Sequence, residues 1–264
     1  MKKTIQTIRG MKVKGERIAC LTAYDALFAS FMEDAEMDLV LVGDSVGMVF
    51  SGYDTTIPVT VEDMIYHTCA VRRTMTSPLL VSDMPFMSYQ ASPEQALKNA
   101  GRLMKEGHAE AVKMEGGRRI AEQIRLCTES GIPVMGHLGM TPQSVHEFGG
   151  FKLQARTREE AEHLRKDALA VQKAGAFALV LEKIPADLAT EITADLEIPT
   201  IGIGAGPGTD GQILVTYDML GLYEKFKPKF VRRYLEAGKE IKNALSDYIH
   251  DVKENNFPDS GESY

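Results

Sequence analysis

The sequence predicts a (β/α)8 TIM barrel, an α/β fold in which parallel strands alternate with helices. Short aliphatic runs alternate with amphipathic segments of helical period in about eight successive steps. The length of 264 residues fits, because this fold typically needs about 250 residues. We therefore expect one barrel domain with an N-terminal helix over residues 1–250, followed by a polar C-terminal tail over 251–264.

The helices of the repeating unit are marked by their ends. Strands are expected within residues 16–25, 38–45, 78–86, 109–115, 132–137, 176–182, 198–206 and 211–220. Three of the intervening helices start after an N-capping residue, namely Thr60, Ser92 and Thr157. Glycines follow the last turns of three helices, at Gly107, Gly131 and Gly175. Strand and helix therefore alternate in the order that a barrel requires.

One long segment interrupts the alternation. Residues Gly139 to Arg156 are largely polar and have no helical period. Loops of this length inside a compact domain are usually lids or binding loops. We expect the segment to lie over the active site and to add little to the apolar core.

The composition is that of a globular protein, with 44% hydrophobic and 25% charged residues. The 37 acidic residues outnumber the 30 basic ones, and no basic block is dense enough to follow a phosphate backbone or an anionic bilayer. We therefore expect neither a nucleic-acid partner nor a membrane partner. Cys20, Cys69 and Cys127 are far apart and form no C-x-x-C pair, which argues against disulfides and structural zinc. Because no apolar signal segment follows the basic N-terminus, we expect a cytoplasmic protein.

Polar residues follow the aliphatic runs at the ends of five expected strands. They are Asp44, Ser45, Asp83, Lys113, Glu115, His137 and Glu182. In a TIM barrel the C-terminal ends of the strands form the face that carries the active site, so these side chains should share one pocket. A single carboxylate there is more often a helix N-cap or a surface ion-pair partner, whereas four acids at one topological position indicate a functional site.

Three of these acids are candidate metal ligands. Carboxylates at close quarters repel one another unless a cation compensates, and oxygen ligands without His or Cys suit Mg²⁺. Asp44, Asp83 and Glu115 are the predicted set. Lys113 has the same strand parity as Glu115 and so projects to the same side, where it would either meet a bound anion or neutralise the acids.

The two remaining groups suit proton transfer. Glu182 follows Leu-Val-Leu, so partial desolvation would make it a usable base, although an ion pair with Lys183 is the alternative. His137 would be a hydrogen-bond donor behind the ligands, a proton carrier or a structural histidine under the loop, and it is included among the candidate substrate-binding residues.

Several common nucleotide and hydrolase motifs are missing from the sequence. In the glycine-rich segment from Gly202 to Gly208, G-x-G-x-x-G fails when it starts at Gly202 or at Gly204, because the sixth position is then Pro207 or Thr209. There is also no G-x-x-x-x-G-K-[ST], H-E-x-x-H or G-x-S-x-G. The glycines instead indicate a close backbone approach at the end of the seventh strand.

Seven segments together give the chain a clear family resemblance. They are LTAYDALFASFMEDAEMDLVLVGDSVGMV, SDMPFMSY, VKMEGG, GHLGMTPQSV, GGFKLQAR, VLEKIP and IGIGAG. In this order, from about Thr4 to about Ile249, the chain resembles the ketopantoate hydroxymethyltransferases. One departure is Ala155 where a glycine is expected, and it concerns only the long loop.

The resemblance implies an activity and a set of roles. The family transfers a hydroxymethyl group from 5,10-methylenetetrahydrofolate to 3-methyl-2-oxobutanoate, giving 2-dehydropantoate for pantothenate and coenzyme A through a Mg²⁺-stabilised enolate. In this sequence the implied Mg²⁺ ligands are Asp44, Asp83 and Glu115. The positions implied to hold the 2-oxo acid are Asp44, Ser45, Asp83 and Lys113. Glu182 matches the general base, and a homodecamer of two pentameric rings is also implied.

Two other functions compete with this interpretation. A Mg²⁺-dependent lyase or mutase of 2-oxo acids on a related barrel would use similar chemistry, but those lyases usually carry a reactive cysteine in a loop at the active-site face. Here Cys20 is expected in a strand, and Cys69 and Cys127 are expected on helices. A barrel that only binds a small metabolite would not account for four acids at one face.

Overall fold

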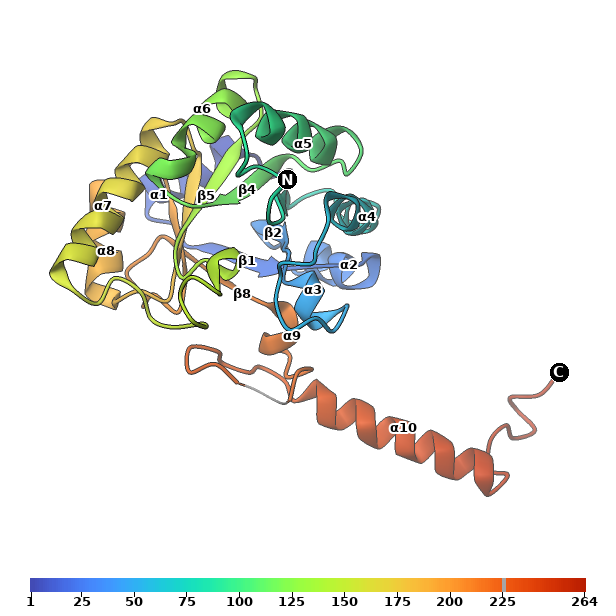
Figure 1. The fold of residues 1–264 in the computed structure, drawn as a ribbon. Helices are drawn as coiled ribbons and strands as arrows, with labels where there is room; N and C mark the ends of the chain where they lie inside the picture. The colour runs from blue at the N-terminus through green and yellow to red at the C-terminus, as the bar shows by residue number, and fades with distance from the viewer. Residues whose placement is uncertain (225–226) are drawn as a thin grey trace. The chain divides into compact units, whose positions relative to one another are not determined.

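The predicted barrel is confirmed by a computed structural model, which describes residues 1–224 and 227–264. Eight parallel strands in the described residues form a closed barrel in chain order, with β1 hydrogen-bonded to β8 (Figure 1). Two compact units make up the chain, Met1–Leu214 and Val215–Tyr264, and each is described by itself. All the barrel strands lie in the first unit. They are β1 Ile18–Thr22, β2 Leu39–Val42, β3 Leu79–Asp83, β4 Ala111–Glu115, β5 Val134–Gly139, β6 Ala178–Glu182, β7 Thr200–Ile203 and β8 Gly211–Leu214.

The longer helices of the first unit alternate with the strands as the sequence pattern predicts, whereas α3 and the two 3-10 turns were not predicted. The helices are α1 Ile5–Lys14, α2 Ala26–Asp34, α3 Val46–Val49, α4 Val61–Arg72, α5 Pro93–Lys105, α6 Ala121–Glu129, α7 Arg158–Lys173 and α8 Ala186–Asp195, with short 3-10 turns η1 Arg118–Ile120 and η2 Pro142–Ser144. The side chains of Thr60, Ser92 and Thr157 each accept a hydrogen bond from the backbone N–H three residues on. The three predicted N-caps are therefore confirmed.

The link between β7 and β8 differs from the regular βα step. Residues 204–210 connect these strands without a helix. Gly204 and Gly206 have φ values of 63° and 79°, in the left-handed region that favours glycine, and Pro207 follows. The chain therefore turns straight back into β8, and the glycine-rich segment acts as a tight connection.

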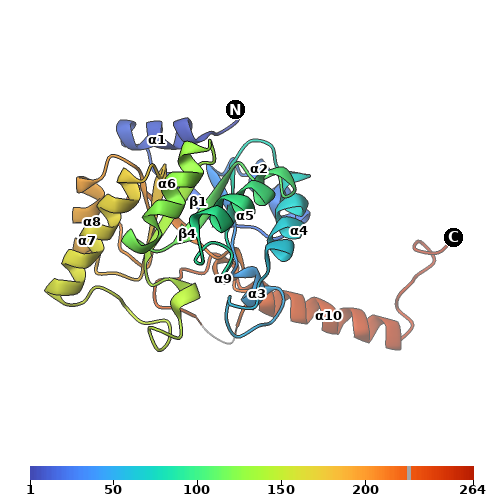
Figure 2. The same cartoon turned by 45° about the horizontal axis from the view of Figure 1, so that its top comes forward.

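The interior of the barrel is filled by inward-facing side chains of successive strands, among them Ile18, Leu39, Val81, Met135 and Ile213. Ile8 and Met11 of α1 belong to the same buried cluster. Lys3 and Lys12 reach Asp38 and Asp210, at 2.9 Å in each case, and these aspartates lie just before β2 and β8. Helix α1 thus closes the end of the barrel at which the strands begin, opposite α3 (Figure 2).

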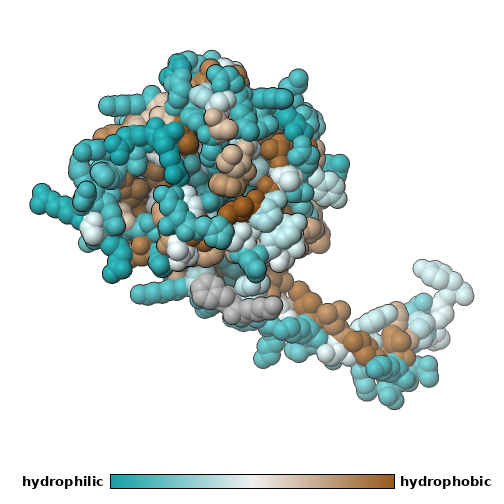
Figure 3. Space-filling model, in the orientation of Figure 1, coloured by the Kyte–Doolittle hydropathy of each residue, from teal (hydrophilic) through white to brown (hydrophobic). Residues whose placement is uncertain are grey.

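The second unit contains α9 Thr216–Met219 and α10 Ala237–Lys253. Helix α10 exposes Ile241, Leu245, Ile249 and Val252 together with Tyr248. Figure 3 shows brown, hydrophobic surface along this helix. The helix runs to Lys253, so the irregular tail begins slightly later than residue 251, where the sequence placed it. None of the helices in the described part of the chain is long and apolar enough to cross a membrane.

Helix α7 packs closely on β5 at Gly136. A Cβ atom at this position would lie 2.5 Å from Val171 Cγ1 and 3.1 Å from Leu179 Cδ1. Gly136→Ala should therefore lower the free energy of unfolding by about 1–3 kcal/mol, as overpacking does. Adding Val171→Ala should make the double variant more stable than the sum of the two single changes predicts, because the truncated valine makes room for the new methyl group. Urea denaturation followed by circular dichroism measures both effects, and strict additivity would show that the close packing is absent.

Candidate active site at the strand ends

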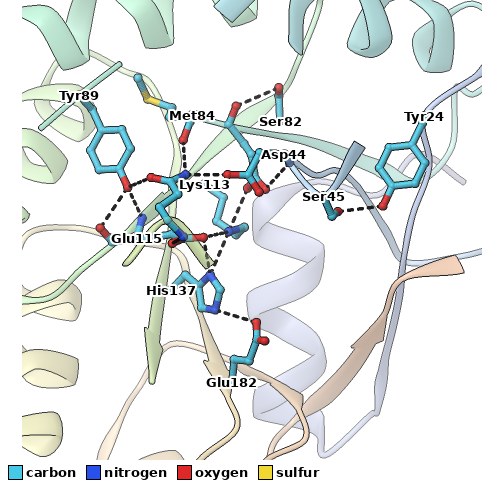
Figure 4. A network of polar contacts seen from close by, with 12 residues as sticks. Tyr24, Asp44, Ser45, Ser82, Met84, Tyr89, Lys113, Glu115, His137 and Glu182 are labelled. Atoms are coloured by element: carbon cyan, nitrogen blue, oxygen red, sulfur yellow. Dashed lines mark hydrogen bonds and ion pairs between the residues drawn. The ribbon is translucent and has the colours of Figure 1, made fainter. Parts of the chain in front are cut away.

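The predicted polar residues lie together at the carboxyl ends of β2 to β6. Asp83 pairs in register with Lys113, Glu115 pairs with His137, and Gly139 pairs with Glu182. Figure 4 shows Asp44, Lys113, Glu115, His137 and Glu182 pointing toward one another, with Lys113 and Glu115 both on β4. Of these, all but Glu182 are buried as whole residues, and the Glu182 side chain is only 12% exposed. The register of the parallel strands therefore creates the cluster that the sequence pattern predicts.

Lys113 is the cation of this cluster. Its ammonium lies 3.0 Å from Asp83 Oδ1 and 3.7 Å from Glu115 Oε1. It also lies 3.0 Å from His137 Nδ1. Lys113 and Glu115 project to the same side of β4, as their spacing of two residues predicts. Lys113 therefore lies within ion-pair distance of two of the three acids.

The acids respond differently to this environment. Burial and the neighbouring carboxylates raise the pKa of Asp44 well above its ordinary value. Burial also raises the pKa of Asp83, and Lys113 only partly offsets the effect. Burial acts in the same direction on Glu115, but the Lys113 charge and the hydrogen bonds that Glu115 accepts outweigh it, so that the pKa of Glu115 is lowered. Glu115 is therefore the acid that the protein itself holds most firmly in the ionised form.

The donor set fits a hard divalent cation. Asp83 Oδ1 and Glu115 Oε1 are buried and accept no hydrogen bond of good geometry, although both face the Lys113 ammonium. Buried carboxylate oxygens without hydrogen bonds are the ligands that Mg²⁺ prefers. In residues 1–224 and 227–264, however, no group of three or more His, Cys, Asp or Glu side chains has a ready-made metal-binding arrangement. A cation bound to these oxygens would therefore require Lys113 to shift.

Two residues of the cluster were missed by the sequence analysis. Gln143, in the long loop after β5, donates from its side-chain amide to Asp44 Oδ2 at 2.8 Å and from its backbone N–H to Glu115 Oε2 at 3.0 Å. Tyr89, in the segment after β3, donates its hydroxyl to Gln143 Oε1 at 2.8 Å. Neither residue ends an aliphatic run, so the strand-end pattern could not find them. The sequence signals for them were that Gln143 lies in a loop of unusual length and that both residues stand in segments that carry the family resemblance, SDMPFMSY and GHLGMTPQSV.

The long loop contributes more to the core than expected. Met140 and Val145 are buried, as are Thr141 and Gln143. The expectation that the segment adds little to the apolar core is therefore wrong for its first half, which packs beside the acids. Phe151 and Leu153 in the second half are exposed.

A cavity of about 450 Å³ lies next to this loop. Its walls include Gly116, Arg119, Leu138, Phe148 and Asp167. None of the seven predicted site residues is among the residues that line it.

His137 connects the acid cluster to Glu182. Its Nδ1 is the partner of Lys113, and because an ammonium can only donate, we assign the lone pair to Nδ1 and the proton to Nε2. Nε2 then faces Glu182 Oε2 at 3.3 Å. Of the three roles left open for His137, the structure favours a connecting group over an isolated structural histidine. The contact also shows that Glu182 faces the cluster.

Ser45 lies at the edge of the site. Its hydroxyl is 2.8 Å from the hydroxyl of Tyr24, and this hydrogen bond is the contact that Figure 4 shows for it. Ser45 precedes α3 without making a side-chain capping bond. Asp44 accepts from Gln143, and its backbone N–H donates to Asp83 Oδ2 at 2.9 Å. These contacts give Asp44 a partner within the cluster, which a helix-capping role would not require.

Solved structures share this fold at low sequence identity. A phosphonopyruvate hydrolase in complex with oxalate and Mg²⁺ has a TM-score of 0.64 at 13% identity, over 99% of this chain and 93% of that chain. A 2,3-dimethylmalate lyase of the phosphoenolpyruvate mutase/isocitrate lyase superfamily has a TM-score of 0.60 at 17% identity, over 98% of this chain and 90% of that chain. Likeness at these identities shows the fold alone.

Comparison of sequences is more specific. A protein of Geobacter sulfurreducens named 3-methyl-2-oxobutanoate hydroxymethyltransferase is 56% identical over 262 residues, which are 99% of this chain and 98% of that protein. A protein of the same name from Syntrophus aciditrophicus is 54% identical over 261 residues, 99% of this chain and 96% of that protein. The model of the family described as ketopantoate hydroxymethyltransferase matches residues 2–260. Because these matches cover nearly the whole chain, it belongs to the ketopantoate hydroxymethyltransferase family.

Proposed function

We propose that this protein transfers a hydroxymethyl group from 5,10-methylenetetrahydrofolate to 3-methyl-2-oxobutanoate, giving 2-dehydropantoate. The observation that carries the proposal is the buried cluster of Asp44, Asp83, Lys113 and Glu115 at one end of the barrel, with Glu182 beside it. A 2-oxo acid needs a compensated negative charge, a polarised carbonyl and a base near C3. Relatives that carry the name of this activity align with the chain from end to end.

Mg²⁺ is the proposed cofactor. Asp44, Asp83 and Glu115 would hold the ion, and two of the oxygens available to it are those that lack hydrogen bonds, Asp83 Oδ1 and Glu115 Oε1. When bound, Mg²⁺ would supply Lewis-acid polarisation of the 2-oxo group, which makes the proton on C3 more acidic.

The remaining residues of the cluster bind and orient the substrate. The Lys113 ammonium is a buried cation whose present partners are carboxylates, so it is suited to hold the carboxylate of the 2-oxo acid. The hydroxyl of Ser45, supported by Tyr24, would hydrogen-bond the same substrate. His137 would contact the substrate or fix the position of Lys113, because it lies directly between Lys113 and Glu182.

Glu182 is the proposed general base. It lies at the C-terminal end of β6 and faces the Nε2 atom of His137. Its carboxylate would remove the C3 proton of 3-methyl-2-oxobutanoate. Water would open the methylene bridge of the folate, breaking its C–N bonds and leaving tetrahydrofolate and a one-carbon unit at the oxidation level of formaldehyde. The nucleophilic carbon would add to this one-carbon unit, and the new alkoxide would take back the proton from Glu182 to give the hydroxymethyl group. The proton on His137 Nε2 would orient the Glu182 carboxylate during this transfer.

A C–C lyase or mutase of 2-oxo acids is the second candidate, favoured only by the shared barrel fold. The positions of the cysteines do not support it. Cys20 lies in β1, Cys69 in α4 and Cys127 in α6, and none of the three is in a loop at the carboxyl ends of the strands.

Three further proposals rest on the family. The chain would assemble as a homodecamer, which light scattering coupled to size-exclusion chromatography would detect. It would act in the cytoplasm on small molecules, without nucleic acid or a membrane as partner. The folate would approach from the face where the strands end, since the acceptor carbon is held there.

Product formation tests the proposed reaction and its metal together. The protein incubated with 3-methyl-2-oxobutanoate, methylenetetrahydrofolate and Mg²⁺ should form 2-dehydropantoate, detected by mass spectrometry. EDTA should stop the reaction and excess Mg²⁺ should restore it. Asp83→Ala should lower the rate by about 10²-fold or more, because metal stabilisation is worth several kcal/mol. Asp34→Ala, which changes an exposed aspartate of α2, is the control and should keep full activity. Full turnover in EDTA would contradict the metal proposal.

Exchange of deuterium at C3 separates the base from the metal site. Glu182→Gln keeps the size of the side chain but removes the proton acceptor, so exchange from C3-labelled 3-methyl-2-oxobutanoate should slow by about 10²–10⁴-fold. Binding of Mg²⁺ and of the 2-oxo acid should be preserved. The readout is NMR without folate, so that only proton removal is observed. Glu197→Gln, an exposed change just after α8, should exchange at the parent rate. If Glu182→Gln also exchanges at that rate, another group removes the proton.

A further inference from the structure

Gln143, in the long loop, contacts two of the predicted metal ligands, Asp44 through its side chain and Glu115 through its backbone N–H. Its amide nitrogen lies 2.8 Å from Asp44 Oδ2, and its backbone N–H donates to Glu115 Oε2 at 3.0 Å. The residue itself is only 5% exposed. Gln143 therefore binds one oxygen of Asp44, which follows β2, and one oxygen of Glu115, which ends β4.

The orientation of the amide is fixed by its other partners. Gln143 Oε1 accepts from the hydroxyl of Tyr89 at 2.8 Å and from the amide of Gln90 at 3.0 Å. The second proton of the Gln143 amide group goes to the carbonyl oxygen of Met84 at 2.9 Å. Because the carbonyl oxygen of Met84 can only accept, the amide nitrogen has to lie on the side of Met84 and Asp44. Tyr89 also accepts from the backbone N–H of Glu115 at 3.0 Å, so the same residues hold Glu115 from two sides.

These contacts leave a defined set of oxygens for a cation. The Gln143 N–H occupies Glu115 Oε2, and the other oxygen of that group, Oε1, accepts no hydrogen bond. The Glu115 carboxylate cannot rotate without breaking the hydrogen bond from Gln143, and its Oε1 then stays 3.7 Å from Lys113 Nζ and 3.4 Å from His137 Nδ1. Hydrogen bonds of this kind to metal-binding carboxylates typically change metal affinity by 10–100-fold.

We propose that Gln143 is a positioning residue that fixes Asp44 and Glu115 in the orientation that a divalent cation needs, and so links the order of the loop to metal binding. The inference rests on the proposed role of these acids as ligands. By linkage, if an ordered loop favours metal binding, then metal binding favours the ordered loop to the same extent. The loop thereby contributes to the site through the acids, and not only as a cover.

Metal affinity tests the side-chain contact directly. Gln143→Met keeps the length of the side chain and the backbone N–H but removes the amide, and it should weaken Mn²⁺ binding by about 10–100-fold in calorimetry. Mn²⁺ is used because it accepts the same oxygen ligands as Mg²⁺. Tyr89→Phe, which frees Gln143 Oε1 of one donor, should weaken binding by a smaller factor. Gln154→Met is the matched control in the same loop, where the amide bonds only the carbonyl oxygen of Lys152, and it should bind Mn²⁺ like the parent.

Hydrogen exchange tests the reciprocal effect without any substitution. Peptides that contain the backbone N–H of Gln143 should exchange more slowly when Mn²⁺ is added to the parent protein, whereas peptides of α7 should not change. This measurement also decides the matter if Gln143→Met fails to fold. Equal Mn²⁺ affinity of the parent and Gln143→Met, an equal loss in Gln154→Met, or unchanged exchange at Gln143 would each overturn the inference. If the parent itself fails to bind Mn²⁺, the metal proposal falls with it, whereas binding by the parent and Gln143→Met alike refutes only the role of Gln143.

Discussion

The compensation of buried negative charge is the constraint on which this site depends. Asp44, Asp83 and Glu115 are buried and close together, so that burial and mutual repulsion both oppose their ionised forms. Lys113 relieves part of this cost from the same strand as Glu115, because residues two apart on a strand face the same way. The alternation of side chains along β4 therefore places the acid Glu115 and its counter-ion Lys113 on the same face of one strand. A cluster with one cation and three acids keeps an excess of negative charge, which a divalent ion or a shift of Lys113 toward a substrate would redistribute.

The barrel accommodates the buried charges because the two ends of its strands differ in the residues that they hold. The starting ends are covered by α1, whose Ile8 and Met11 complete the apolar core. The carboxyl ends hold the polar groups of the site, which need hydrogen-bond and ion-pair partners in place of aliphatic neighbours. Gly136 shows how the two demands coexist on one strand: it lets α7 approach β5 closely, while the next residue, His137, points into the polar cluster. The contact with an outer helix and the contact with the polar cluster are thus made by neighbouring residues of one strand.

The sequence predicts the strand-end residues well because a period of two and a strand boundary are local features. Asp83, Lys113, Glu115 and Glu182 could each be located from the aliphatic run before them. Gln143 and Tyr89 could not, since their positions depend on how irregular segments fold back onto the barrel, and no residue period encodes that path. The same reason explains why the loop after β5 was expected to be a cover, although its first half is buried. For His137 the pattern gave the place, but only the contacts with Lys113 and Glu182 distinguish among its roles.

The pairing of β1 with β8 has a consequence for the order in which the protein is made. The ribosome releases β1 early, yet its partner Gly211–Leu214 is synthesised nearly two hundred residues later. The same holds for Lys12, whose partner is Asp210. Until then one edge of β1 has unpaired backbone groups, and such edges invite pairing with other chains. Contacts between residues so far apart in the chain also form slowly. We therefore expect the nascent chain to depend on its surroundings until its last strand has emerged, and truncation just before residue 211 to yield an aggregating product instead of a smaller barrel.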